Sequence, residues 1–294
     1  MEDAFLTMAR LPTWLKQSKG KLRSTRALSE RLDFKMPNTI CQEARCPNRA
    51  ECFEKGALTF MILGITCTRN CAFCSVTHGT PNPPDLKELD EILHTIERLK
   101  LRFVVLTSPN RDDLPDGGAG HYASIVTGIK TAFPDVKVEV LVPDFQGEKA
   151  DLETVLAAKP HVLNHNVETV PSLYRTVRKG SLFDRSLAVL NMAKTLDPGV
   201  LTKSGLMLGL GEEREELLST FQQIRDQNVD ILTLGQYLKP DKQSHDVMKY
   251  YPPEEFDELK EAALKMGYKF VFSGPMIRSS YLAEHIFHDT ILTS

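Results

Sequence analysis

The chain has 294 residues, of which 41% are hydrophobic and 26% charged, and its formal net charge is −3. These values are those of an ordinary globular protein, one large domain or two smaller ones, that buries its core without disulfide bonds. No run of eighteen apolar residues occurs, and the N-terminal segment lacks the basic and apolar regions of a signal peptide. Glu2 and Asp3 also argue against a transit peptide. We therefore expect no transmembrane helix and a location in the cytoplasm, where thiols stay reduced.

Basic residues dominate residues 10–35, where they face only Glu30 and Asp33. This pattern is typical of a solvated arm, and it also fits a docking surface for an acidic partner. Nucleic acid is not expected as that partner, because the basic residues are not interleaved with aromatic ones and the whole chain is slightly acidic.

Residues 1–55 are expected to be irregular or short-helical, and strands alternate with helices from residue 58 onward. The apolar runs predict strands at 59–65, 102–107, 137–143, 161–166, 202–208 and 230–236, with a last short run at 269–274. Helices are predicted at 86–99, 120–132, 148–157, in two pieces within 171–194, at 213–227 and at 253–266. Strands rich in Val, Ile and Leu that alternate with helices indicate parallel β/α units.

About six such units are too few for a closed eight-stranded barrel. A doubly wound sheet is the alternative, but the loops favour a barrel-like arrangement. Polar and glycine-rich segments follow the strands at 66–75, 108–118, 164–168, 209–212 and 236–239. Because ligand sites of parallel α/β folds lie at the carboxyl ends of the strands, we expect these loops to converge. The predicted fold is α/β, a partial (β/α)6 TIM-type barrel with N-terminal and C-terminal extensions.

All six cysteines lie between Cys41 and Cys74, in two triplets. The first has the spacing C-x4-C-x5-C and consists of Cys41, Cys46 and Cys52. The second has the spacing C-x3-C-x2-C and consists of Cys67, Cys71 and Cys74. Each triplet is one ligand short of four, which suggests two iron–sulfur clusters, one of them with an iron open for chemistry. A zinc site is the alternative, although structural zinc favours paired C-x2-C arms and four protein ligands.

The second triplet, with Phe73 before its last cysteine, resembles that of radical S-adenosylmethionine (SAM) enzymes. The segment GLMLGLGE (205–212) is similar to a glycine-rich pattern of the same superfamily. The resemblance implies that the second triplet holds a catalytic 4Fe–4S cluster whose fourth iron binds SAM. An electron from that cluster then splits the sulfonium and yields a 5′-deoxyadenosyl radical.

The same resemblance implies contacts with SAM. Asn166 and Glu168 are expected near the ribose hydroxyls, although a helix N-terminus would also favour these residue types. Arg178 is expected at a carboxylate of SAM or substrate. The other predicted cofactor-binding residues are Phe73, Met207, Gly209, Gln236 and Tyr237, with Met207 packed on the adenine and Gln236 and Tyr237 at its edge.

The first triplet narrows the resemblance to the lipoyl synthase family. RSSY (278–281), TSPNRDDLPDGGAGHY (107–122), NHNVETV (164–170) and LTLGQYL (232–238) carry it, and it extends over residues 12–285. It implies that the first triplet holds an auxiliary 4Fe–4S cluster with a serine as the fourth ligand, Ser280 or alternatively Ser279. Without the cysteines, RSSY would read as an ordinary polar turn. The implied division is 1–57 for the extension with the auxiliary triplet, 58–274 for the barrel, and 275–294 for the C-terminal extension with the serine.

The implied reaction inserts two sulfur atoms, supplied by the auxiliary cluster, at carbons six and eight of a protein-bound octanoyl-lysine. The implied partners are octanoylated lipoyl carrier domains (the E2 component of a 2-oxoacid dehydrogenase or the glycine cleavage H protein), a flavodoxin or ferredoxin, and an iron–sulfur carrier that rebuilds the cluster. Nothing in the sequence demands more than a monomer.

One departure from the family pattern qualifies the resemblance. Pro109 and Asn110 stand where the family usually has Val and Asp, which leaves the fine contacts of this loop open. Alternatives to a lipoyl synthase are a biotin-synthase-type sulfurtransferase, disfavoured because the auxiliary triplet precedes the barrel, and an iron–sulfur scaffold or electron carrier.

Overall fold

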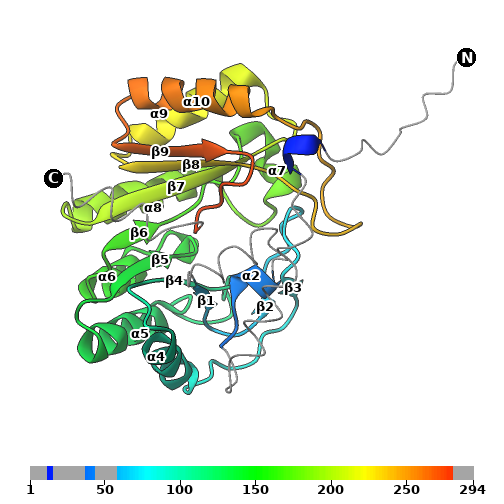
Figure 1. Cartoon of the computed structure of the whole chain (residues 1–294). Helices are drawn as coiled ribbons and strands as arrows, with labels where there is room; N and C mark the ends of the chain where they lie inside the picture. Colours follow the sequence, from blue (N-terminus) through cyan, green and yellow to red (C-terminus); the bar gives the residue numbers. More distant parts are fainter. Residues whose placement is uncertain (1–11, 16–36, 44–57, 281–294) are drawn as a thin grey trace, which may run out of the picture.

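The structure, a computed structural model, describes residues 12–15, 37–43 and 58–280, except for the side chains of residues 41 and 42. Its centre is a sheet of seven strands in the order β1-β4-β5-β6-β7-β8-β9, in which every neighbouring pair is parallel (Figure 1). The strands are β1 (Thr59–Met61), β4 (Phe103–Thr107), β5 (Lys137–Leu141), β6 (Val162–Asn164), β7 (Leu201–Leu208), β8 (Ile231–Gln236) and β9 (Phe270–Gly274).

Helices connect successive strands and cover the outside of the sheet. They are α4 (Glu88–Leu99), α5 (Ala119–Ala132), α6 (Lys149–Ala157), α7 (Tyr174–Val177), α8 (Phe183–Leu196), α9 (Arg214–Arg225) and α10 (Pro253–Lys265). Figure 1 shows the sheet curved, with α4, α5 and α6 outside the half formed by β4, β5 and β6, and α9 and α10 outside the half formed by β7, β8 and β9. The paired strands run from β1 at one edge to β9 at the other, so the predicted partial barrel is confirmed, and the apolar run at 269–274 is its seventh strand.

The first strand is shorter than its apolar sequence predicts. β1 ends at Met61, and Leu63 adopts a left-handed backbone with φ of 65°. The amides of Leu63 and Gly64 donate to the Glu88 carboxylate at 2.8 and 3.1 Å, which turns the chain toward the second cysteine triplet. Ile62 and Leu63 are nevertheless buried. The apolar run therefore indicated burial, and the backbone conformation beyond Met61 is set by Glu88.

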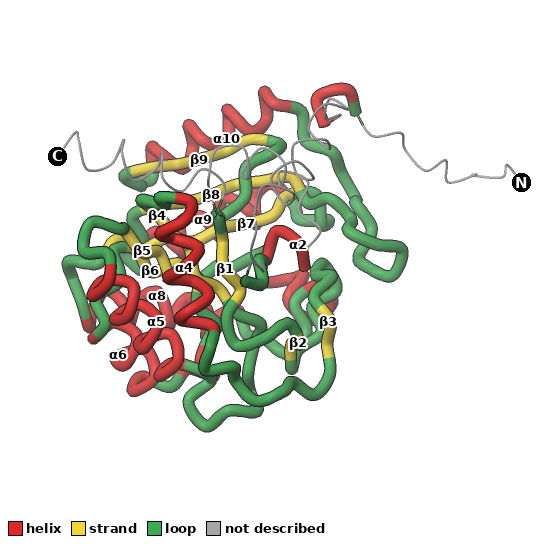
Figure 2. Tube along the Cα trace, turned by 60° about the horizontal axis from the view of Figure 1, so that its bottom comes forward, coloured by secondary structure: helices red, strands yellow, loops and turns green. Residues whose placement is uncertain are grey.

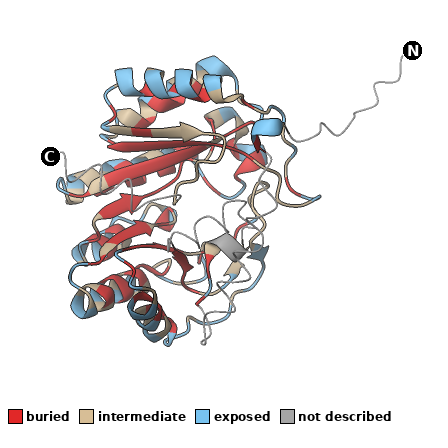
Figure 3. Ribbon diagram, viewed as in Figure 1, coloured by how far each residue is buried: buried red, intermediate tan, exposed pale blue. Residues whose placement is uncertain are grey.

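The hydrophobic core lies between the sheet and its helices, where Figure 3 shows the strands as mostly buried. One part packs β1, β4, β5 and β6 against α4, α5, α6 and α8, and includes Phe60, Val104 and Val140. The other part packs β7, β8 and β9 against α8, α9 and α10, and includes Leu232 and Phe221. β1, β4 and β8 are buried along their whole length, on both faces of the sheet, which is why such strands read as nearly continuous apolar runs.

A buried ion pair occupies the inside of the sheet. The Lys203 ammonium lies 3.0 and 3.1 Å from the two carboxylate oxygens of Glu139, and Asn164 donates to the same carboxylate at 3.0 Å. Both charged side chains are almost fully buried. Pairing offsets the cost of removing these charges from water.

Several short elements lie outside the seven-stranded sheet. They are α2 (Ile40–Glu43), the parallel strands β2 (Thr66–Cys67) and β3 (Thr77–His78), and the 3-10 helices η1 (Thr13–Leu15), η2 (Phe145–Gly147) and η3 (Pro171–Leu173). Figure 2 shows three of them, α2, β2 and β3, close together. Asn38 and Thr39 pair with β1 along its free edge. In the described part of the chain, no helix has the length and apolar character that crossing a membrane requires.

Candidate active site

A cavity of about 500 Å³ opens at the carboxyl ends of the strands. Its walls come from Ile40, the cysteine loop 67–76, residues 107–110, Leu141, Asn166 and Glu168, Arg178, the end of β7 at 205–207, residues 233–240 and the C-terminal segment 277–280. Four of the five predicted loops therefore converge. The fifth, 209–212, does not line the cavity, because the Glu212 carboxylate accepts hydrogen bonds from the amides of Gly209, Leu210 and Gly211 and folds the loop onto itself.

The cysteine loop is fixed at both ends and in the middle. β2 and β3 pair in parallel, so the chain leaves at Cys67 and returns beside it, with Cys67 opposite His78. At the middle of the loop, the Ala72 amide donates to the Val177 carbonyl at 2.8 Å, and its carbonyl accepts from the His245 amide at 2.7 Å. The three thiols are thus carried by a loop whose backbone is already ordered.

The three thiols of this loop are partly buried and all line the cavity. Amide groups point at their sulfur atoms: Asn110 and Arg69 donate to Cys67 Sγ at 3.3 and 3.4 Å, and Val76 donates to Cys74 Sγ at 3.4 Å. Such N–H···S bonds are typical of cysteines that ligate iron–sulfur clusters. Three thiols with amide donors at one cavity therefore fit a cluster held by three cysteines.

Burial raises the pKa of the Cys71 thiol to about 11 and that of the Cys74 thiol to about 12. Nearby charges act in both directions on Cys71, because Arg178 lowers its pKa while Cys67 and Glu168 raise it. Buried thiols of this kind stay neutral at pH 7 unless a cation takes them as thiolates. Their chemistry therefore depends on what binds in the cavity.

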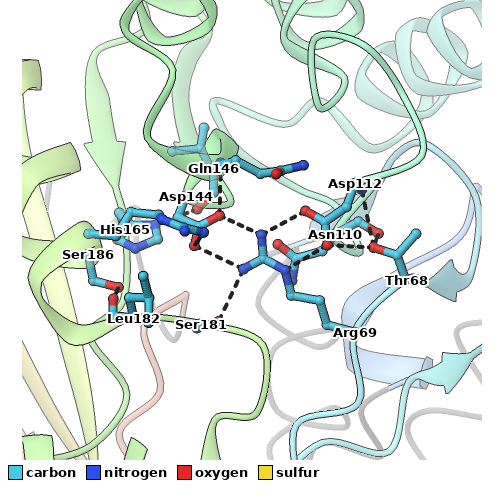
Figure 4. Close-up of polar contacts among 12 residues, drawn as sticks. Thr68, Arg69, Asn110, Asp112, Asp144, Gln146, His165, Ser181, Leu182 and Ser186 are labelled. Carbon is cyan, nitrogen blue, oxygen red and sulfur yellow. Dashed lines mark hydrogen bonds and ion pairs between the residues drawn. The ribbon is translucent and has the colours of Figure 1, made fainter.

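Arg69 of the cysteine loop is the centre of a buried charge cluster (Figure 4). Its guanidinium makes bidentate contacts with Asp112 and with Asp144 at 2.7 to 2.9 Å and donates to Ser181 Oγ at 3.1 Å. All five N–H donors of the arginine are thereby used. Burial opposes the charge of Arg69, but the hydrogen bonds to the two carboxylates raise its pKa above the ordinary value. The cluster ties the cysteine loop to the loops that follow β4 and β5 and to the segment before α8.

Asn166, Glu168 and Arg178 form a polar wall of the cavity. Glu168 has a left-handed φ of 71° and is held there because its amide and carbonyl pair with Gly205 and Met207 of β7. The Asn166 amide donates to Glu168 Oε1 at 3.1 Å, while its Oδ1 is buried and has no partner among the described residues. A left-handed non-glycine residue and an unpartnered buried acceptor are features that accumulate at ligand sites.

Arg178 is 9% exposed and is positioned by its own helix region. Its Nη1 donates to Tyr174 OH and Ser186 Oγ, each at 2.8 Å. Burial disfavours its charge, but Tyr174 and Glu168 raise its pKa. Conversely, burial raises the pKa of Glu168, against the charge of Arg178. The cavity therefore has a buried cation beside a carboxylate.

The other wall is apolar. Phe73, Met207 and Tyr237 pack around Val177 and Leu210, and all three also line the cavity. Tyr237 directs its hydroxyl away from the apolar wall to the His245 carbonyl at 2.8 Å. A flat apolar ring would find complementary surface here.

Gln236 and Gly209 have mainly internal contacts. The Gln236 amide donates to the carbonyls of Leu208, Tyr237 and Lys249 and accepts from the Tyr251 amide, so its hydrogen-bonding groups are occupied. Gly209 has a φ of +100°, and a Cβ there would collide with the Lys249 carbonyl. Gly209 does not line the cavity, whereas Gln236 does. Their contacts with a cofactor stay predictions, which this geometry does not favour.

The C-terminal segment crosses the mouth of the barrel. A Cβ on Gly235 of β8 would overlap the Ile277 carbonyl, so this close approach requires glycine. Ser279 accepts a hydrogen bond from Asn166 Nδ2 at 3.2 Å, whereas Ser280 has no hydrogen bond with a described residue. Arg278, Ser279 and Ser280 line the same cavity as the second cysteine triplet. Tyr281, Cys46, Cys52 and the side chain of Cys41 lie outside the described residues, although the backbone of Cys41 belongs to α2.

Sequence reasoning missed the Arg69 cluster, and Asp144 in particular. Asp144 follows β5, whose loop carries no glycine-rich or cysteine motif before residue 147. A usable signal was its position, since an acidic residue after a parallel strand lies at the same end of the sheet as the cysteine loop.

Comparisons with known proteins agree with this geometry. A model of the radical SAM superfamily matches residues 61–224. Curated lipoyl synthases match over nearly the whole chain: that of Geobacter metallireducens is 49% identical, covering 95% of this chain and 98% of its own, and that of Caldicellulosiruptor saccharolyticus is 48% identical, covering 93% and 96%. Among solved structures, SuiB of Streptococcus suis with S-adenosylmethionine has a TM-score of 0.56 at 12% identity, covering 86% of this chain and 60% of its own. Methylornithine synthase (PylB) has a TM-score of 0.52 at 17% identity, covering 88% and 79%. These two structures support the fold alone.

The seven-stranded parallel sheet, the three cysteines at its open end and the superfamily match define a radical SAM enzyme, a class that works with a 4Fe–4S cluster and SAM. Identity near one half over almost the full length of several relatives narrows this further. The chain belongs to the lipoyl synthase family.

Proposed function

We infer that this enzyme makes the lipoyl group by inserting two sulfur atoms at carbons six and eight of a protein-bound octanoyl-lysine. Family membership supports this, and one observation within the molecule carries it: the second cysteine triplet and the serines of the C-terminal segment line the same cavity. An unactivated C–H bond gives acid–base groups nothing to act on. A radical initiator and a sulfur donor are therefore both required, and they must share one chamber.

We propose that Cys67, Cys71 and Cys74 hold the catalytic cluster. When bound, that cluster and SAM supply a 5′-deoxyadenosyl radical that abstracts hydrogen from the octanoyl chain. The protein orders the three sulfur atoms in advance through β2, β3 and the amide donors of Arg69, Asn110 and Val76.

The polar and apolar walls are proposed to divide the SAM molecule between them. Arg178 pairs with the carboxylate, because it is a buried cation within reach of the cavity. Asn166 and Glu168 take the ribose hydroxyls, which would satisfy the unpartnered Oδ1 of Asn166. Phe73, Met207 and Tyr237 give the adenine an apolar surface that excludes water. Gln236 then acts mainly by holding the loop 237–251 in place.

An auxiliary 4Fe–4S cluster, held by Cys41, Cys46 and Cys52 with a serine, is proposed as the sulfur source. Two contacts support its location: Ile40, the first residue of the helix that contains Cys41, lines the cavity, and Ser75 of the cysteine loop donates to the Glu43 carbonyl at 3.0 Å. Ser280 is the favoured serine, because the hydroxyl of Ser279 is engaged with Asn166. A hard oxygen ligand binds cluster iron less firmly than thiolate does, which suits a cluster that is consumed.

The enzyme acts on lipoyl carrier proteins, and the finer assignments are proposals. The carriers are the E2 component or the H protein, electrons come from a flavodoxin or ferredoxin, and an iron–sulfur carrier rebuilds the auxiliary cluster. The monomer works in the cytoplasm, since its cysteines must remain reduced. The chain would divide into residues 1–57, 58–274 and 275–294. The basic residues within 10–35, all of which lie outside the described residues, would meet an acidic carrier surface.

The test is an anaerobic reaction of the reconstituted enzyme with SAM, dithionite and an octanoyl-lysine peptide, followed by mass spectrometry. Lipoyl peptide together with 5′-deoxyadenosine is expected, with about eight irons per chain. Deoxyadenosine without sulfur insertion would indicate a different radical SAM enzyme. A protein that binds zinc and cleaves no SAM would refute the proposal.

Variants separate the two clusters. Cys71→Ala should abolish SAM cleavage. Cys46→Ala and Ser280→Ala should retain part of the cleavage and lose sulfur insertion. Ser279→Ala should retain cleavage and more of the sulfur insertion than Ser280→Ala does, because it removes a hydrogen bond to Asn166 and no proposed cluster ligand. Lipoyl product from the Cys46 variant would refute the proposed division of labour.

A further inference from the structure

Asn110 donates twice to one cluster ligand. Its backbone amide lies 3.3 Å from Cys67 Sγ, and its side-chain Nδ2 lies 3.9 Å from the same sulfur. The second contact is long for a hydrogen bond but lies within the range of N–H···S interactions. Asn110 therefore places a neutral, polar N–H group against a sulfur atom that is proposed to bind iron.

The position of Asn110 is fixed by Thr68, the residue that follows Cys67. Its carbonyl accepts hydrogen bonds from both the amide and the hydroxyl of Thr68, each at 3.0 Å. Figure 4 shows Asn110 beside Thr68 and Arg69. Asn110 is thus bonded to Thr68 through its carbonyl and to Cys67 through its backbone amide. These bonds hold the Asn110 side chain against Cys67.

The charges around this contact are already balanced. Asp112 pairs with Arg69 at 2.7 Å, and Asp113 pairs with Arg111 at 2.8 Å. Of the acidic loop that follows β4, the residue nearest Cys67 is thus the uncharged one, and it lines the cavity. The Asn110 side-chain amide is thus a neutral donor at this sulfur, together with the backbone amides of Asn110 and Arg69.

We propose that Asn110 tunes the reduction potential of the cluster held by the second cysteine triplet, an inference that rests on the proposed function. Reduction adds one electron from a low-potential donor to the cluster and breaks no bond, so negative charge on the sulfur atoms increases. An N–H donor at Cys67 stabilises this added charge and makes the cluster easier to reduce. A carboxylate at the same position would oppose it, because it cannot donate when ionised and brings a negative charge.

The size of the effect follows from the strength of the contact. A net hydrogen bond of about 0.7 kcal/mol corresponds to about a threefold change in the ratio of reduced to oxidised cluster at a fixed potential. For a one-electron couple this is a shift of ~30 mV. Asn110→Leu removes the side-chain donor alone and should shift the potential downward by this amount. Asn110→Asp adds a negative charge. It should lower the ratio of reduced to oxidised cluster about tenfold, which is a downward shift of the potential by ~59 mV.

The experiment is a redox titration of the full-length reconstituted enzyme, followed by electron paramagnetic resonance of the reduced cluster signal that responds to added SAM. Asn70→Asp is the matched control, because Asn70 is in the same loop and lines the same cavity but is exposed and bonds to His78 rather than to a cysteine. The added charge at residue 70 is screened by water, so the ratio of reduced to oxidised cluster in Asn70→Asp should change less than twofold.

The outcomes are distinct. A downward shift in both Asn110 variants, larger for Asp, supports the inference. Equal potentials in wild type, Asn110→Leu and Asn110→Asp would overturn it, as would an upward shift or an equal shift in Asn70→Asp. If Asn110→Asp does not bind a cluster, the potential of Asn110→Leu decides the test, because that variant adds no charge. A wild-type protein without a SAM-responsive signal would instead refute the proposed function.

Discussion

Replacement of Arg69 by methionine removes a cation that two carboxylates share. Asp144 is fully buried and Asp112 is 30% exposed, and each lies 2.7 Å from Arg69 Nη2. Methionine fills much of the same volume without a charge. The variant therefore leaves the Asp144 carboxylate in the interior, with Arg185 at 3.4 Å as its remaining cationic contact. Arg69→Lys would keep the charge, but an ammonium cannot reproduce the two bidentate contacts.

Two independent routes give the size of the loss. Removing one partner of a buried ion pair costs about 3–5 kcal/mol. The pKa of Asp144 provides the other route: burial alone would raise it, but hydrogen bonds and charge from Arg69 lower it from 3.8 to about 2. A net lowering of this size corresponds to about 2 kcal/mol at neutral pH, and the loss of Arg69 should exceed it because burial would then act unopposed by this arginine. We therefore expect about 3 kcal/mol, concentrated in the loops that Arg69 joins.

Hydrogen exchange followed by mass spectrometry measures this loss where it occurs. Amides of residues 67–74 should exchange about a hundredfold faster in Arg69→Met, while those of β7 should change little. Arg69→Met combined with Asp144→Asn should recover part of the protection, because no buried charge remains. Arg185→Met is the control. The Arg185 side chain is 26% exposed and 3.4 Å from Asp144, so its loss should lower the stability by less than about 1 kcal/mol. If Arg69→Met and Arg185→Met exchanged alike, the reasoning about the buried pair would be wrong.

Three further predictions follow from the same geometry. Gly235→Ala should displace Ile277, because the added Cβ would overlap the Ile277 carbonyl. Sulfur insertion should then fall at least tenfold and fewer than eight irons should remain bound, while SAM cleavage persists. Equal loss of both activities would contradict this prediction. Because the folded pKa of Asp144 is depressed, its stabilisation is present above 3.8 and is lost as the pH falls toward 2, so the urea midpoint of wild type should drop more steeply below pH 4 than that of Asp144→Asn. Charge reversal at Lys19, Lys21 and Arg23 should weaken binding of a carrier domain and leave turnover of a short peptide unchanged, as enzyme kinetics with both substrates would reveal.

The fold could be predicted from the sequence because parallel strands buried on both faces read as apolar runs. The runs at 202–208 and 230–236 match β7 and β8 to within one residue. The exception is 59–65, where Glu88, far along the chain, caps the amides of Leu63 and Gly64 and ends the strand. A long-range contact of a single carboxylate leaves no periodic signal, which is why this boundary was missed.

The spacing of Cys67, Cys71 and Cys74 predicted that they share one loop, and the structure places all three at one cavity, while their role as cluster ligands stays a prediction. The site was not predictable where chemistry depends on pairing across the fold. Arg69 and Asp144 are 75 residues apart, and no sequence motif around either residue indicates that the other is its partner. Gly209 shows the converse case, since its motif was recognised while its packing against Lys249 was not foreseen.

The two halves of the proposed chemistry meet at Asn166. Its amide donates to Glu168 of the polar wall, the proposed SAM side, at 3.1 Å and to Ser279 of the C-terminal segment at 3.2 Å. Two donors of a planar amide cannot move independently, so the position of the serine segment is coupled to the polar wall. Gly235 reinforces the coupling from β8, where the Ile277 carbonyl lies in place of a side chain. In the proposed reaction the radical and the sulfur donor both have to reach the same alkyl chain, and an amide shared by Glu168 and Ser279 holds the two sides of the cavity in a fixed arrangement.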